Sequence, residues 1–184
     1  LKYIICPTTG LDHIDLVYVK ELKIKLFSLK NQTSFLRKVP STAELTVLLI
    51  LALLRNFSYG YENVKSLNWR NNLDRGFELN GKKVGIIGMG RLGKIVSKII
   101  NAFGGEIYFF DIDPNIHYKK YKRVSSISEI FEITDIVSIH IPLNETTKNL
   151  IDKNIFSLKK INCKYLVNTS RGEVLDQEAL IRAL

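Results

Sequence analysis

The chain has 184 residues, of which 46% are hydrophobic and 24% charged, a composition typical of a globular protein with one domain or one domain and part of another. The longest apolar run, residues 47–54, is far shorter than the ~20 residues that span a bilayer, which argues against a membrane protein. The net charge of +9 comes from scattered lysines without interleaved aromatic residues. It therefore favours a solvated basic surface over a nucleic-acid site.

The first 40 residues are predicted to form one unit. Its expected elements are a strand at 3–6, a turn at 8–10, a short helix at 15–22 and a second strand at 25–29. Pro40-Ser41-Thr42 then begins a long helix, roughly residues 43–55, which is apolar on nearly all sides and is expected to be buried in a core or a subunit interface. A further helical stretch at 59–69 and a polar, turn-rich segment at 71–81 are expected to follow.

Residues 83–93 carry the most informative pattern. An apolar strand at 83–87 runs into Gly88-x-Gly90-x-x-Gly93, and apolar residues at helical spacing continue to residue 103. A second strand at 106–110 ends in Asp111. The order of strand, glycines, helix, strand and acid predicts a dinucleotide site and disfavours the alternative, a structural glycine turn without a ligand.

Each residue of this pattern has a physical role in such a site. Gly88 allows a tight turn, Gly90 lets the backbone approach a pyrophosphate, and Gly93 lets the helix pack on the strand. The helix N-terminus offers N–H groups and partial positive charge to the phosphates. Asp111 would accept hydrogen bonds from the adenosine ribose and repel a 2′-phosphate, which favours NAD over NADP.

Strands and helices continue to alternate after Asp111. A helix at 128–133, a strand at 136–140, a helix at 152–158, a strand at 165–168 and a helix from Asp176 are expected. This alternation predicts an α/β fold, a Rossmann-like doubly wound parallel sheet.

The remaining reactive residue types point to structural roles. Cys6 and Cys163 lie far apart and outside any C-x-x-C, which predicts free thiols in a reducing, cytoplasmic compartment. No histidine, cysteine or acidic residues have the spacing of a metal site. We expect a structural hydrogen bond at His13, solvent around His117, and a loop-bracing role for His140.

Several motifs together resemble the D-isomer-specific 2-hydroxyacid dehydrogenase family, which includes D-lactate, glyoxylate, formate and phosphoglycerate dehydrogenases. Besides the glycine motif and Asp111, they are Gly10-x-Asp12-His13-Ile14-Asp15, Thr42-Ala43-Glu44-Leu45, Asp135-Ile136-Val137-x-x-His140-x-Pro142-Leu143 with Thr146-Thr147, and Asn168-x-x-Arg171-Gly172 with Asp176. The resemblance implies that residues 1–40 are the C-terminal part of a flavodoxin-like substrate domain. Residues 41–184 would be an NAD-binding Rossmann domain, incomplete at its C-terminal end, and the whole chain a fragment cut at both ends.

The resemblance also assigns roles to single residues. Arg171 matches the catalytic arginine, which would bind the substrate carboxylate and polarise the carbonyl, and the backbone at Thr9 and Gly10 would receive the carboxylate. NAD would contact Gly88, Gly90, Arg91, Leu92, Gly93, Asp111, Ile141, Pro142, Thr147, Thr169, Ser170 and Arg171, with Thr42 a weaker assignment near the nicotinamide ribose. The family's acid-base histidine and its glutamate are expected beyond Leu184, so these 184 residues are expected to hold NAD without turnover.

The function implied by the resemblance is hydride transfer between NAD and a small D-2-hydroxy acid or 2-keto acid, by a homodimer. The alternative within the family is an NAD(H)-sensing corepressor without significant turnover. A methyltransferase is a third option, which the segment Asn168 to Gly172 disfavours because an arginine there has no role in methyl transfer.

Overall fold

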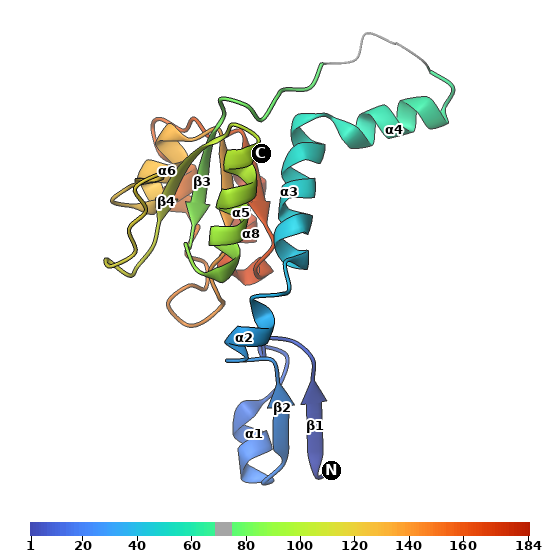
Figure 1. The fold of residues 1–184 in the computed structure, drawn as a ribbon, viewed down its shortest axis with the longest axis vertical. Coiled ribbons are helices and arrows are strands. Elements are labelled where there is room, and N and C mark those ends of the chain that lie inside the picture. The colour runs from blue at the N-terminus through green and yellow to red at the C-terminus, as the bar shows by residue number, and fades with distance from the viewer. Residues whose placement is uncertain (69–74) are drawn as a thin grey trace. The chain divides into compact units, whose positions relative to one another are not determined.

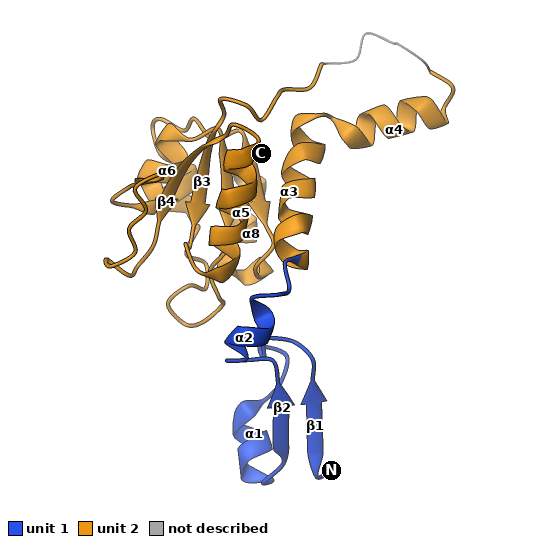
Figure 2. Ribbon diagram, viewed as in Figure 1, with its two compact units in different colours: residues 1–40 blue, residues 41–184 orange. Residues whose placement is uncertain are grey.

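A computed structural model describes residues 1–68 and 75–184 (Figure 1). The chain divides into two compact units, Leu1–Pro40 and Ser41–Leu184 (Figure 2). The helix predicted at 59–69 is observed at Phe57–Lys65, so it begins earlier and ends sooner than the pattern predicts. Residue 69 and the start of the turn-rich segment predicted at 71–81 lie outside the described residues.

The first unit contains two parallel strands and two short helices. Strand β1 (Tyr3–Cys6) pairs with β2 (Lys25–Ser28), and the helices are α1 (Leu16–Glu21) and α2 (Thr33–Leu36). Helix α1 begins where the Asp15 carboxylate accepts the Val17 and Tyr18 N–H groups at 3.0 and 2.9 Å, an N-cap that satisfies two donors of its first turn. The sequence pattern predicts these elements except α2, which is only one turn long.

The second unit is built on a parallel sheet, which has five strands in the described part of the chain. In sheet order they are β5 (Lys122–Arg123), β4 (Glu106–Phe110), β3 (Lys83–Ile87), β6 (Ile136–Ile139) and β7 (Tyr165–Asn168). The helices are α3 (Ser41–Leu54), α4 (Phe57–Lys65), α5 (Arg91–Ala102), α6 (Ile127–Ile133), α7 (Lys153–Phe156), the 3₁₀ turn η1 (Gly172–Val174) and α8 (Gln177–Ala183). The predicted doubly wound α/β fold is confirmed.

Each face of this sheet has its own hydrophobic core. One core joins α3 and α5 to the sheet through Ile50, Ile100, Ile86 and Phe109. The other joins α6 and α7 to the opposite face through Ile130, Ile155, Val137 and Ile139. Because successive side chains of a strand point to opposite faces, Ile136 lies in the first core and Val137 in the second. The sheet is thereby packed between two layers of helices.

Helix α3 is buried on one side. Ala43, Thr46, Val47, Ile50 and Leu54 face the core, whereas Leu45, Leu48, Leu49 and Leu53 are 38% to 61% exposed. Within residues 1–68 and 75–184, no single helix is long and apolar enough to cross a membrane; residues 33–54 and 57–65 meet that test only as a bent pair, by length and composition alone.

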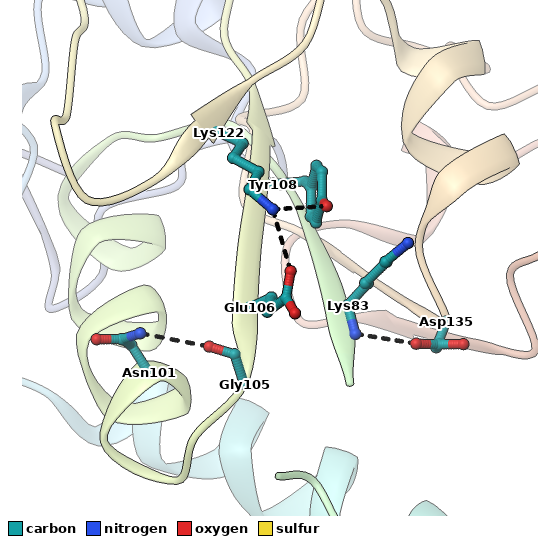
Figure 3. Close-up of polar contacts among 7 residues, drawn as sticks. All are labelled: Lys83, Asn101, Gly105, Glu106, Tyr108, Lys122 and Asp135. Atoms are coloured by element: carbon teal, nitrogen blue, oxygen red, sulfur yellow. Dashed lines mark hydrogen bonds and ion pairs between the residues drawn. The ribbon is translucent and has the colours of Figure 1, made fainter. Parts of the chain in front are cut away.

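The residues that begin the strands, at the amino edge of the sheet, are bonded to one another (Figure 3). Asp135 donates its N–H to the Lys83 carbonyl at 2.8 Å, and its carboxylate accepts the Lys83 N–H at 2.9 Å. The Lys122 ammonium lies 3.1 Å from the Glu106 carboxylate and donates to the Tyr108 hydroxyl at 3.0 Å. These contacts tie β3 to β6 and β4 to β5.

Candidate functional site

The candidate site residues of the second unit follow the carboxyl ends of the strands. Gly88 follows β3, Asp111 follows β4, Ile141 follows β6, and Thr169 follows β7. All these strands are parallel neighbours, so their loops emerge at one edge of the sheet. The chain continues from β3 toward β4 on one side and from β6 toward β7 on the other, and such a reversal of strand order is where open α/β sheets bind ligands.

The three glycines of the loop after β3 have different surroundings. Gly88 has a φ of +93°, and a Cβ there would lie 2.7 Å from the Ile141 side chain and 2.8 Å from the His140 carbonyl oxygen. A Cβ on Gly93 would collide with the Gly88 carbonyl oxygen, so Gly93 sets the close packing of α5 on the loop. A Cβ on Gly90 would have no atom within 4 Å. Gly90 therefore faces open space at the N-terminus of α5, where it is the N-cap.

Asp111 joins the loop after β4 to the glycine loop. Its carboxylate accepts the Met89 N–H at 2.6 Å and the Asp113 N–H at 3.0 Å. Each carboxylate oxygen can accept a further hydrogen bond. The acid is half-buried and is held by backbone donors on both sides, so its carboxylate is fixed in direction before any ligand arrives.

The loop after β6 is closed by its own side chains. Thr147 donates its hydroxyl to the Pro142 carbonyl at 2.7 Å and accepts the Asn144 N–H at 2.8 Å.

His140, the first residue after β6, places its Nε2 2.9 Å from the Ser138 hydroxyl. Its Nδ1 is buried without a hydrogen-bond partner among the described residues, and burial lowers the pKa of this imidazole to about 4. His140 is therefore neutral near pH 7.

The loop after β7 holds Arg171. Asn168 donates its amide to the Arg171 carbonyl at 2.8 Å and accepts the Ser170 N–H and hydroxyl at 2.9 and 2.7 Å. The Arg171 guanidinium donates to the Ser170 carbonyl at 2.9 Å. Asn168 thus closes a tight turn that fixes the root of the arginine side chain.

A buried residue of α3 reaches the same loop. The Thr46 hydroxyl lies 2.8 Å from the Thr169 hydroxyl and also donates to the Thr42 carbonyl at 2.8 Å. This bond joins residues 123 positions apart, so no local pattern reveals it. The only signal in the sequence is that Thr46 lies one turn after Thr42, where the apolar part of the helix begins.

Thr9 and Gly10 belong to the first unit. The Thr8 hydroxyl donates to the Gly10 carbonyl at 2.8 Å and lies 3.1 Å from the Cys6 sulfur. His13 Nε2 lies 3.5 Å from the same sulfur. The turn is therefore closed by side chains of its own unit, and the structural hydrogen bond expected at His13 is present.

The residues at the carboxyl edge fit a dinucleotide. The φ of Gly90 is −73°, which any residue adopts, and a Cβ there would touch nothing. Its lack of a side chain is thus not required by the fold and leaves room for a pyrophosphate. Arg91 begins α5, where a cation opposes the helix dipole and an anionic ligand offsets this cost. In the described part of the chain, no group of three or more histidine, cysteine and acidic side chains could hold a metal ion.

Comparisons with known proteins agree with this geometry. The family model described as the NAD binding domain of D-isomer specific 2-hydroxyacid dehydrogenases matches residues 47–184. The chain is 33% identical to a hydroxypyruvate reductase of Thermotoga maritima over 98% of this chain and 56% of that protein.

Solved structures give the same result. An NAD-dependent formate dehydrogenase of Staphylococcus aureus, in complex with NAD, matches with a TM-score of 0.84 and 34% identity over 100% of this chain and 54% of that one. A D-lactate dehydrogenase of Aquifex aeolicus, complexed with NAD and lactic acid, has a TM-score of 0.79 and 31% identity over the same shares. The chain thus spans about half the length of these relatives. It belongs to the D-isomer specific 2-hydroxyacid dehydrogenase family, and residues 47–184 are matched by the model of that family's NAD binding domain.

Proposed function

We propose that the protein is an NAD-dependent oxidoreductase that transfers a hydride between nicotinamide and a small D-2-hydroxy acid or its 2-keto acid. The observation that carries this proposal is the meeting of a glycine loop, a fixed carboxylate and a braced arginine loop at one edge of the sheet. The relatives named above are enzymes by name, which favours this activity over the corepressor alternative.

The carboxyl edge would hold NAD along its length. The backbone of Gly90, Arg91 and Leu92 at the start of α5 would bind the pyrophosphate, because the first N–H groups of a helix have no partner within the helix. Asp111 would accept hydrogen bonds from the adenosine ribose. Ile141, Pro142 and Thr147 would line the adenosine side, and Thr169, Ser170 and Arg171 the nicotinamide side.

Arg171 would act on the substrate. Its planar guanidinium suits a bidentate contact with a carboxylate and carbonyl oxygen, and its positive charge stabilises the oxyanion that develops when a hydride reaches the carbonyl carbon. Bound NADH supplies that hydride. The backbone at Thr9 and Gly10 would receive the substrate carboxylate, as the family resemblance implies.

The cofactor is tested by titrating the protein with NAD and NADP in a calorimeter. We expect tighter binding of NAD, because the Asp111 carboxylate repels a 2′-phosphate. Asp111→Ala is expected to weaken NAD binding and to narrow the difference between the two cofactors. Tighter binding of NADP by the parent protein would contradict this assignment.

The substrate class is tested by following NADH oxidation with a panel of small 2-keto acids, in a protein that also carries the acid-base histidine and the glutamate that the family resemblance implies. Pyruvate and hydroxypyruvate are the first choices, because relatives are named for D-lactate and hydroxypyruvate. Matched aldehydes and ketones without a carboxylate are the controls. Equal turnover of these controls would exclude the proposed role of Arg171.

A homodimer is part of the proposal. Leu45, Leu48 and Leu53 leave an exposed apolar stripe on α3, and α4 adds Phe57 and Val64, which are 64% and 55% exposed. Exposed apolar surface of this kind is typical of subunit interfaces. Sedimentation of the protein at micromolar concentration is expected to give a dimer, and Leu48→Glu a monomer. A monomeric parent protein would refute this.

The compartment we propose is the cytoplasm. Cys6 and Cys163 are both free thiols in the structure, as a reducing environment requires. Fractionation of the native cell tests this: recovery of the protein outside the cytoplasm would contradict it.

A further inference from the structure

Arg123 closes the loop that follows the ribose-side acid. From β5, its guanidinium donates to the carbonyl of Asp111 at 2.6 Å through Nη2, and to the carbonyls of Asp113 and Ile116 at 3.0 and 2.9 Å through Nη1. The same guanidinium lies 5.7 Å from the centre of the Phe109 ring. One half-buried side chain thus holds three backbone positions of the segment 111–116.

The base of this side chain is fixed by the sheet. Arg123 is the register partner of Phe109 on β4, and the next residue, Val124, donates its N–H to the Phe109 carbonyl at 3.0 Å. The contact therefore runs from one rigid strand to the loop that leaves its neighbour. A flat guanidinium with donors in a fixed fork can meet several carbonyls at once, which a lysine ammonium cannot reproduce with the same geometry.

The loop that Arg123 holds carries Asp111 at its first position. The backbone of Asp111 is bound by Arg123, while its carboxylate receives the N–H groups of Met89 and Asp113. Arg123 also holds the carbonyl of Asp113, the residue whose N–H orients one oxygen of this carboxylate. Movement of the segment would therefore turn the Asp111 carboxylate away from the glycine loop.

These bonds also decide between two roles for a cation at this place. An arginine after the second strand of a dinucleotide site can bind the 2′-phosphate of NADP. Here the guanidinium binds backbone carbonyls through both terminal nitrogens. These N–H donors point to carbonyls of the loop 111–116. The bonds therefore favour a residue that holds the loop in place over one that binds a 2′-phosphate.

We propose that Arg123 is a positioning residue for cofactor selection: by holding the carbonyls of Asp111, Asp113 and Ile116 it fixes the Asp111 carboxylate toward the adenosine ribose, and so maintains the preference for NAD over NADP. This inference rests on the proposed function, which places NAD at the carboxyl edge. It adds a residue from β5 that touches neither the substrate nor the reacting atoms.

The experiment measures calorimetric dissociation constants of NAD, NADP and ADP-ribose for the parent protein, Arg123→Lys and Arg123→Met. Both variants are expected to bind NAD and ADP-ribose about tenfold more weakly, with the ratio of NAD to NADP affinity reduced by a similar factor. Hydrogen exchange at the Asp113 amide, which donates to the Asp111 carboxylate, is expected to accelerate. Lys122→Met, the neighbouring residue on β5, is the matched control and should leave every constant unchanged.

The outcomes separate a positioning role from a purely structural one. If the variants fold and their ratio of NAD to NADP affinity equals that of the parent, the proposal is overturned, even if both affinities fall together. If Arg123→Met does not fold, Arg123→Lys decides by the same ratio, because it keeps the charge and the length of the side chain. Asp111→Ala separates a failure of the proposed function from a failure of this inference. Unchanged NAD binding by Asp111→Ala would refute the ribose site itself. Weaker NAD binding by Asp111→Ala, with no change in the Arg123 variants, would refute only the positioning role of Arg123.

Discussion

At the amino edge of the sheet, Asp135 and Lys83 bond to each other, whereas at the carboxyl edge Asp111 bonds to the backbone of two loops. Both acids stand beside a strand of the same sheet and accept backbone N–H groups. The Asp135 contact joins two strands directly, but the Asp111 contact shapes a loop beside the open space at Gly90. We expect substitutions at the amino edge to change stability alone, and substitutions at the carboxyl edge to change binding and turnover.

The largest effect is expected at Arg171. Arg171→Ala should lower kcat/KM by about 10²- to 10³-fold, the usual loss when a group that stabilises a developing oxyanion is removed. The dissociation constant of NAD should change little, because the Asn168 bonds that close the loop after β7 remain and most of the proposed NAD contacts lie elsewhere along the carboxyl edge. Steady-state kinetics on the best 2-keto acid, in a protein that also carries the acid-base histidine and glutamate implied by the resemblance, measures kcat/KM, and NAD titration measures the dissociation constant.

Arg171→Lys is the control for charge. An ammonium keeps the charge but not the planar pair of donors, so only a partial recovery of kcat/KM is expected. Turnover near that of the parent in Arg171→Ala would show that the catalytic assignment is wrong.

Gly93 and Gly90 lie in the same glycine loop but differ in the space that a methyl group would find. Gly93→Ala places a methyl group against the Gly88 carbonyl, a backbone atom that cannot move aside cheaply, and should cost about 1–3 kcal/mol of stability. A methyl group on Gly90 meets no atom within 4 Å, so the cost of Gly90→Ala to stability should come only from the poorer N-cap that alanine makes, about 0.5–1 kcal/mol. It should nevertheless weaken NAD binding about tenfold, because the methyl group enters the proposed pyrophosphate space.

Urea unfolding and NAD titration of the two variants test this pair. Gly93→Ala should lower the urea unfolding midpoint more than Gly90→Ala does, and Gly90→Ala should weaken NAD binding by more than its smaller loss of stability explains. Full NAD affinity in a folded Gly90→Ala protein would exclude the glycine loop as the phosphate site.

His140 gives the carboxyl edge a dependence on pH. Burial lowers its pKa to about 4, below its ordinary value near 6.5. Between these values the unfolded chain binds the proton and the folded chain does not. Stability from this group is therefore complete above about pH 6.5 and is lost as pH falls toward 4, by up to about 1.4 kcal/mol per pH unit.

The comparison with His140→Gln isolates this effect from the carboxylates that also titrate in acid. As the pH falls from about 7.5 to about 4.5, the unfolding free energy of the parent should decrease relative to that of the variant. Parallel curves would mean that His140 is protonated equally easily in the folded and unfolded chains.

The sequence predicts the elements whose pattern is local. The loop Gly88 to Gly93 is recognisable because a strand, a turn and a helix each leave a short-range signal, and the observed β4 begins and ends where the pattern predicts, at Glu106 and Phe110. Strand β5 leaves no such signal, since Lys122 and Arg123 are both charged. It exists because its backbone pairs with β4.

In the candidate site too, local sequence patterns predict some residues, and others become visible only in the folded structure. The motifs locate Asp111 and Arg171, but the braces that orient them depend on tertiary contact. Thr46 meets Thr169 across 123 residues, and Arg123 reaches back to Asp111 only because β5 pairs beside β4. Residue type and spacing predict the chemistry of a site, whereas the residues that position it become visible once the strands are placed.

The smallest effect on function is expected at the amino edge. Asp135→Ala leaves the Lys83 N–H without its acceptor, bound now at 2.9 Å, and removes the partner of the Asn162 amide at 3.3 Å. Loss of these bonds should cost about 1–2 kcal/mol. Asp135 directly precedes β6 at the amino edge of the sheet (Figure 3), whereas Asp111 directly follows β4 at the carboxyl edge, so the dissociation constant of NAD should not change.

Lys122→Met is the control on the same edge. Lys122 and Glu106 keep 63% and 48% of their side chains exposed, and an exposed ion pair contributes little because water and salt screen it. The urea unfolding midpoint of Lys122→Met should therefore match that of the parent protein, whereas the midpoint of Asp135→Ala should be lower. If Asp135→Ala instead weakened NAD binding in a protein that remained folded, the two edges would be coupled through β3 and β6, and the separation of stability from function between them would be wrong.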